Sequence, residues 1–287
     1  LQPGQKDAAS ELAQLLLDDA EPAEGVEMLR AALKLAPEDA ALHVRLGEAL
    51  RHLGEPAAAV RSFRIALGLQ PDLPGALLGL ADALLAQGPD AAAIALVDRA
   101  MELDPAQPIA QARAIRALAL AGLQQHDAAL AEWERVLALR PDDPDAHFGR
   151  AMALLVTGRY QEGWAEYAWR WRRRDNADAN RMPVEPLSRP DPALWPGRTV
   201  LLYSEQAQGD SIQFLHYARL VVARGARVVL EVHAGLKSLA AGIPDLAGVF
   251  ARGDELPPHD IALPLLHLPW AFGTTLETIP ATVPYLR

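Results

Sequence analysis

A short polar loop in the second half of the chain carries the residue best suited to acid–base chemistry. Asp210 follows the β-prone run Thr199–Tyr203 and opens an amphipathic segment that continues to Val221. Doubly wound sheets bind ligands at loops that leave the carboxyl end of a strand, and a carboxylate there can take a proton from a hydroxyl group. In the other interpretation Asp210 only caps the helix by accepting hydrogen bonds from its first turn. Both roles stay open.

Other chemistry finds little support in the sequence. It contains none of the motifs Gly-x-Ser-x-Gly, Gly-x-x-x-x-Gly-Lys, Gly-x-Gly-x-x-Gly and His-Glu-x-x-His, and it has no cysteine. His259 and His267 lack the spacing of metal ligands. We therefore predict no metal and no bound cofactor. The absence of cysteine suits a reducing compartment, so we expect a cytoplasmic protein.

The composition is that of a folded protein. The chain has 287 residues, 51% of them hydrophobic and 22% charged, enough for about two domains. The net charge of −10 argues against a nucleic-acid partner. The longest apolar stretch, 261–272, is interrupted by Pro264, His267 and Pro269 and is too short to cross a bilayer. The chain begins with Leu1, so we expect it to be a piece of a longer protein.

The loop around Asp210 belongs to a segment in which strands and helices alternate. The runs 199–203, 227–232, 249–250 and 261–263 are predicted strands, and a short helix is predicted around 236–241. This alternation predicts a parallel sheet of Rossmann-like architecture over residues 197–287. The proline-rich stretch 175–196 before it is predicted to be a linker.

The first half of the chain is a repeat array. Pro37, Pro71, Pro105 and Pro141 close similar apolar runs and are spaced 34, 34 and 36 residues apart. Within each period the apolar residues recur at helical spacing, which predicts two short amphipathic helices per unit. Glycines mark the turn between them, at Gly54, Gly88, Gly122 and Gly158. The fourth unit has two extra residues, which we place in its inter-helix turn around Gln124.

This pattern over residues 6–174, about five units, resembles the tetratricopeptide repeat (TPR). The resemblance implies an α-superhelix whose first helices line a concave groove that binds a peptide or protein. The slots that would face the groove hold Val44, Glu48, Arg51, Leu78, Asp82, Arg116, Phe148 and Met152. Neither the carboxylate clamp of chaperone-tail-binding TPRs nor the asparagine ladder of O-GlcNAc transferases is present in these slots. These residues could instead form a solvated face or pack on the following domain.

The repeat region ends in an unusual run of tryptophans and arginines, Trp169–Arg174. Such a run could bind phosphate or nucleic acid. Alternatively, the arginines complement the end of a helix and stack on tryptophan rings. Trp164, Trp169, Trp171 and Trp195 gather near the junction, so we expect the repeats and the sheet to pack together there.

The loop at 204–214 also resembles a loop in bacterial TPR proteins that continue into a transferase-like domain. That domain is similar to the first half of GT-B glycosyltransferases, notably heptosyltransferases. The resemblance implies a ligand-binding loop and assigns Asp210 as the base for an acceptor hydroxyl, whereas Ala207 and His267 depart from the pattern. The residues of this loop are Glu205, Gln206, Gly209 and Gln213.

Two functions follow from these resemblances. The first is a protein-binding TPR scaffold attached to a glycosyltransferase-like half-domain. The alternative is a GT-B glycosyltransferase that acts on a sugar or protein hydroxyl, with a nucleotide sugar as its substrate. Because the resemblance covers only the acceptor-side half, we predict that this chain alone has no transferase activity.

Overall fold

The computed structural model describes residues 22–104, 109–176 and 187–281. The chain forms two compact units, which meet in sequence between Pro141 and Asp142. The predicted first helix of the first repeat lies before residue 22, and residues 177–186 of the predicted linker also lie outside the described part.

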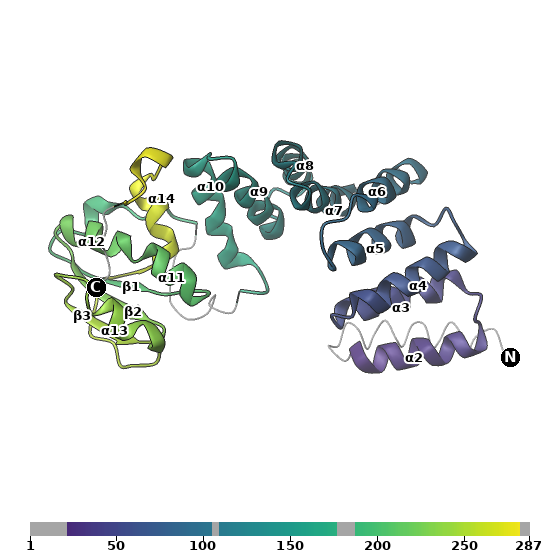
Figure 1. Cartoon of the computed structure of the whole chain (residues 1–287), viewed down its shortest axis with the longest axis horizontal. Helices are drawn as coiled ribbons and strands as arrows, with labels where there is room; N and C mark the ends of the chain where they lie inside the picture. The colour runs from purple at the N-terminus through teal and green to yellow at the C-terminus, as the bar shows by residue number, and fades with distance from the viewer. Residues whose placement is uncertain (1–21, 105–108, 177–186, 282–287) are drawn as a thin grey trace. The chain divides into compact units, whose positions relative to one another are not determined.

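The first unit consists of antiparallel helix pairs, as the 34-residue period predicts. Prolines occupy the first turn of several helices, where a missing N–H costs nothing. The helix that begins at Ala40 is instead capped by Asp39, which accepts from the Leu42 N–H at 3.1 Å. The helices, coloured purple to blue in Figure 1, are α2 (Pro22–Leu35), α3 (Ala40–His52), α4 (Pro56–Leu69), α5 (Pro74–Leu85), α6 (Ala92–Leu103), α7 (Ile109–Gly122) and α8 (His126–Leu139).

The turn within each pair depends on one residue with a left-handed backbone. Gly54 has a φ of 74°, and the amide of Glu55 donates back to the Leu50 carbonyl, which closes the helix end. In the fourth repeat, the predicted turn glycine, Gly122, is instead the last residue of α7, and Gln124 takes the left-handed position with a φ of 63°. The turn 123–125 is no longer than the turn 53–55. The extra residues therefore do not lengthen this turn, and our placement of them was wrong.

Close helix packing in the first unit depends on small residues around one aromatic ring. Phe63 of α4 is fully buried. A Cβ atom added to Gly47 of α3 would lie 2.7 Å from this ring, and one added to Gly79 of α5 would lie 2.3 Å from it. Both distances are below van der Waals contact, so glycine at these two positions is what allows α3 and α5 to approach α4.

The second unit begins with one more helix pair, α9 (Pro144–Val156) and α10 (Tyr160–Tyr167), which continues into the 3₁₀ helix η1 (Ala168–Arg172). A parallel sheet follows, with strands β1 (Thr199–Tyr203), β2 (Arg227–Val232), β3 (Gly248–Ala251) and β4 (Ile261–Pro264). The four strands fall where the sequence predicts them. Their order is β3-β2-β1-β4, so the connections run away from β1 in both directions.

Short helices connect the strands. The predicted helix after β1 is broken at Leu215 into α11 (Gln208–Phe214) and α12 (His216–Ala223), and α13 (Lys237–Ala240) and α14 (Leu268–Phe272) follow β2 and β4. Single turns of 3₁₀ helix complete the set: η2 (Pro192–Leu194), η3 (Ala234–Leu236), η4 (Leu265–His267) and η5 (Leu276–Thr278). Figure 1 shows α11 and α12 beside the strands.

The helix pair α9–α10 and the sheet share one hydrophobic core. Tyr167 of α10 is buried in the same cluster as the strand residues Val200 and Leu230, and Trp164 packs edge-on against Phe214 with ring centroids 5.5 Å apart. Trp171 is 7% exposed and Trp195 only 1%. The expected packing of tryptophans at this junction is therefore confirmed for these residues.

Candidate functional site

Six of the eight predicted groove residues lie on α3, α5 and α7 of the first unit, and two of these pair with each other. Arg51 Nε of α3 lies 3.2 Å from Asp82 Oδ2 of α5, and both side chains are about one-third exposed. Val44 is half-buried, whereas Leu78 is buried in the core. The surface of α3 and α5 therefore carries an ion pair and the half-buried side chain of Val44, whereas Leu78 does not contribute to it.

Glu48 gives this surface its electrostatic character. Loss of hydration raises the pKa of its carboxyl group, although Arg51 and Arg45 act in the opposite direction. The residue as a whole remains exposed. A carboxylate that is partly stripped of water gains more from a donor on a partner than a fully hydrated one does.

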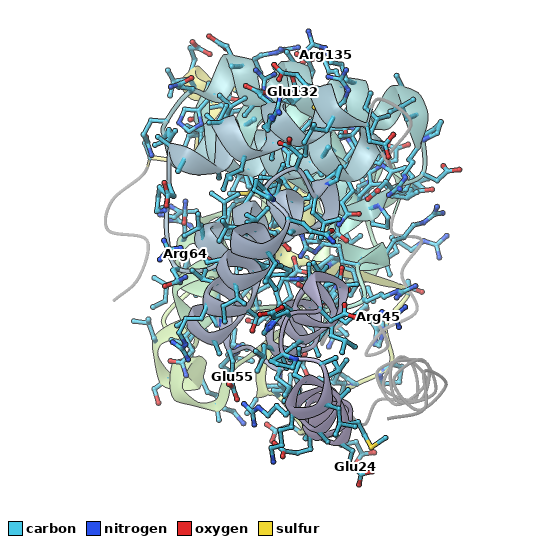
Figure 2. The ribbon with its side chains drawn as sticks, turned by 90° about the vertical axis from the view of Figure 1, so that its right-hand side faces the viewer. Glu24, Arg45, Glu55, Arg64, Glu132 and Arg135 are labelled. Atoms are coloured by element: carbon cyan, nitrogen blue, oxygen red, sulfur yellow. The ribbon has the colours of Figure 1, made fainter. Side chains whose placement is uncertain are left out.

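Arg116, another predicted groove residue, takes part in contacts between helices. Its Nη1 donates to Glu132 Oε1 of α8 at 2.7 Å, and its Nε lies 3.1 Å from Asp98 Oδ1 of α6. Glu132 also accepts from Arg113 at 3.0 Å and from Arg135. The Glu132 side chain is only 2% exposed, and Figure 2 shows Glu132 and Arg135 side by side.

The same arrangement recurs one period later, in the second unit. Glu166 of α10 accepts from Arg150 Nη1 at 2.9 Å and contacts His147 Nδ1 at 2.6 Å. Glu166 lies 34 residues after Glu132, as Arg150 does after Arg116. The sequence analysis missed this repeated acidic position, although the period of 34 that revealed the repeats would also have revealed it.

The last two predicted groove residues differ in accessibility. Phe148 lies under the Arg173 guanidinium, 4.3 Å from the ring centroid, and beside the Tyr167 ring. Met152 is 44% exposed. Of the two, only Met152 presents a large free apolar surface.

Three of the four arginines in the Trp169–Arg174 run make intramolecular contacts. Arg172 stacks on Trp169 with its guanidinium carbon 5.0 Å from the ring centroid, and Arg173 forms a two-point ion pair with Asp175. Arg170 stacks on Tyr167 and Trp171. These contacts favour the structural interpretation of the run over phosphate binding.

Arg170 reaches the carboxyl edge of the sheet, at the point where the strand order changes direction. It forms an ion pair with Glu205, which follows β1, and its Nη2 lies 3.3 Å from His267 Nδ1, which follows β4. Its Nη1 donates to the Tyr167 carbonyl at 3.0 Å. The side chains of Arg170 and Glu205 are 4% and 2% exposed. The structure thus places Glu205 of the predicted ligand loop inside the protein.

The rest of the loop is more accessible. Gln206 has a φ of 56°, an uncommon backbone for a residue with a side chain, and its amide Nε2 donates to the Tyr167 hydroxyl at 3.0 Å. His233 Nε2 lies 2.9 Å from the Gln206 carbonyl. Asp210 Oδ2 accepts from the Ala207 N–H at 3.3 Å. Asp210 is the third residue of α11 and accepts from the residue before the helix, so it is not the N-cap that the capping interpretation expects.

A cavity of about 520 Å³ lies beside Gly209 and Gln213 of the predicted loop. Its walls come from the pair α9–α10, from α11 and α12, and from the segment after α14. The principal apolar lining residues are Leu155, Tyr160, Trp164, Ile212, Phe214 and Ile279. Gly209 and Gln213 thus face a cavity, whereas Glu205 does not line it.

Among the described residues, no group of three or more His, Asp or Glu side chains is placed to hold a metal ion. No helix in this part of the chain is both long and apolar enough to span a bilayer.

Comparison with solved structures places the helical part among known repeat proteins. PilW, a type IV pilus biogenesis factor, is 22% identical, and the match covers 63% of this chain and 96% of PilW with a TM-score of 0.53. A thermophilic TPR protein of Thermus thermophilus is 23% identical over 61% of this chain and 95% of its own, with a TM-score of 0.50. MamA of Desulfovibrio magneticus RS-1 is 19% identical over 58% and 93%, also at 0.50.

A family model gives the assignment. No curated protein matches the sequence. The tetratricopeptide repeat model, however, matches residues 10–74, 53–108 and 116–179, which together make up more than half of the chain. With the helix pairs and turns described above, this match shows that the chain belongs to the tetratricopeptide repeat family.

Proposed function

We propose that the repeats bind an extended segment of a protein partner across the first helices α3, α5 and α7. The observation that carries this proposal is the Arg51–Asp82 ion pair, which joins two repeats on that surface. Side chains that are already ordered lose less conformational freedom when a partner binds. Glu48 offers a partly dehydrated carboxylate to a basic group or N–H of the partner.

Charge reversal at two arginines tests this proposal, because Arg45 and Arg64 project from opposite sides of the helices in Figure 2. Arg45→Glu removes a cation that competes for Glu48 and places a second carboxylate beside it, so we expect capture of a partner with a basic group to rise about tenfold. Arg64→Glu makes the same change in charge on the other side and should leave capture unchanged. Photo-crosslinking in cell extract, followed by quantitative mass spectrometry, measures the amount of partner that each variant captures. Equal changes in the two variants, no change in either, or a fall in Arg45→Glu would contradict the proposed surface.

As a second candidate, we propose that residues 197–287 form a Rossmann-like, glycosyltransferase-like half-domain attached to the repeats of residues 6–174. The strand order β3-β2-β1-β4 favours it, because ligands of doubly wound sheets bind where the order reverses. In this proposal Asp210 accepts the proton of an acceptor hydroxyl.

Donor binding tests whether this chain is by itself a complete transferase. We expect no binding of UDP-, GDP- or ADP-sugars to this chain in calorimetric titration. Among the described residues that line the cavity beside Gly209 and Gln213, none is Lys or Arg, so no basic side chain is placed to hold a diphosphate. Micromolar donor binding with turnover that Asp210→Asn abolishes would show instead that this chain is itself a transferase.

A further inference from the structure

The cavity in the second unit has walls that are fixed before any ligand arrives. Trp164 packs edge-on against both Tyr167 and Phe214, each with ring centroids 5.5 Å apart. Phe214 stacks on Tyr217 at 6.1 Å, and the Tyr217 hydroxyl lies 2.8 Å from Thr274 Oγ1. Because these rings hold one another in place, little of their side-chain conformational entropy is lost when a ligand binds.

The lining carries no formal charge. None of the described lining residues is Asp, Glu, Lys or Arg. The lining contains one histidine, His216, and burial, aided by Arg219, lowers the pKa of its imidazole below the usual value. His216 is therefore neutral at pH 7. The other polar side-chain groups of the lining are hydroxyls and one amide, those of Tyr160, Tyr217, Thr274 and Gln213.

We propose that this cavity binds a neutral, largely apolar small molecule that contains an aromatic ring. The volume of about 520 Å³ falls within the range of small-molecule sites. The rings of Trp164 and Phe214 offer faces and edges for stacking, and Tyr160 and Gln213 can bond to a hydroxyl or carbonyl group. An anion entering the cavity would lose water without meeting a cation, and a cation would meet no carboxylate.

Two fluorescent probes that share one aromatic skeleton test the charge preference. N-phenyl-1-naphthylamine is neutral, and 1-anilinonaphthalene-8-sulfonate is the same molecule with a sulfonate. We expect the neutral probe to bind with one-to-one stoichiometry and roughly tenfold or more tighter than the sulfonate, because the sulfonate would be buried unpaired. Fluorescence titration of the intact chain measures both affinities.

Three variants locate the binding. Ile212→Trp fills the cavity and should lower the affinity for the neutral probe about tenfold, because less space is left for it. Gln213→Lys puts a cation at an exposed lining position, and we expect it to reverse the preference in favour of the sulfonate. Gln208→Lys is the matched control, since the same substitution is made on the same helix, outside the lining. It should leave both affinities unchanged.

Several results would overturn the proposal. The neutral probe could fail to saturate, the two probes could bind equally, or tetramethylammonium could displace the neutral probe. Equal effects of Gln213→Lys and Gln208→Lys would place the probe outside the cavity. Because Gln213 and Gln208 are both exposed, these variants should fold even if Ile212→Trp does not.

Discussion

Replacing Arg170 by alanine should lower the free energy of unfolding of the second unit by about 3–5 kcal/mol. The substitution removes the Arg170 guanidinium that pairs with Glu205, whose side chain is 2% exposed, and so weakens the compensation for burying this carboxylate. It also removes the stacking on Tyr167 and Trp171 and the hydrogen bond to the Tyr167 carbonyl. Hydrogen exchange of the β1 amides measures the effect and should accelerate more than 100-fold.

Two comparisons separate the buried ion pair from a general effect of losing an arginine. Arg172→Ala removes an exposed arginine from the same 3₁₀ helix and should change stability by no more than about 0.5 kcal/mol. Arg170→Met with Glu205→Met replaces the pair by apolar side chains and should recover most of the loss. If the β1 amides exchanged at the same rate in Arg170→Ala as in Arg172→Ala, the Arg170–Glu205 ion pair would not be what stabilises the sheet.

Local signals in the sequence sufficed for most elements of the fold. The apolar, β-prone runs predict β1 and β2 at their observed residues, because both strands are buried and consist mostly of apolar side chains. The 34-residue period predicts the helix pairs. The turn of the fourth repeat was misplaced because Gln124, not a glycine, adopts the left-handed backbone there. Nothing in the type of that residue signals a positive φ.

The candidate sites depended on contacts between distant residues, which a local pattern does not contain. Glu205 has the position of a ligand-loop residue, but its role depends on Arg170, which lies 35 residues earlier. Arg116 has the helical position of a groove residue, yet the carboxylates of Asp98 and Glu132 hold its guanidinium. The helical period predicts the face of the helix on which the Cβ atom lies. It does not predict the position of the guanidinium group, because a long arginine side chain can extend to a nearby buried carboxylate.

Glu132→Gln should destabilise the first unit by about 3 kcal/mol, the second largest effect that we expect. The substitution keeps the size of the side chain and removes the charge that Arg113, Arg116 and Arg135 share. Arg113 is only 22% exposed, so water replaces the lost interaction poorly. The amide oxygen of Gln can still accept hydrogen bonds. The expected loss in the free energy of unfolding is therefore at the lower end of the range for breaking a buried ion pair.

A neighbouring glutamate on the same helix serves as the control. Glu134→Gln changes the charge by the same amount at an exposed position of α8 and should cost no more than about 0.5 kcal/mol. Hydrogen exchange of α7 and α8 amides reports on both variants, and exchange in β1 reports on the second unit. Because Glu132 contacts arginines of both α7 and α8, we expect the two helices to exchange faster together. Acceleration confined to α8 would mean that Glu132 stabilises its own helix and does not join it to α7.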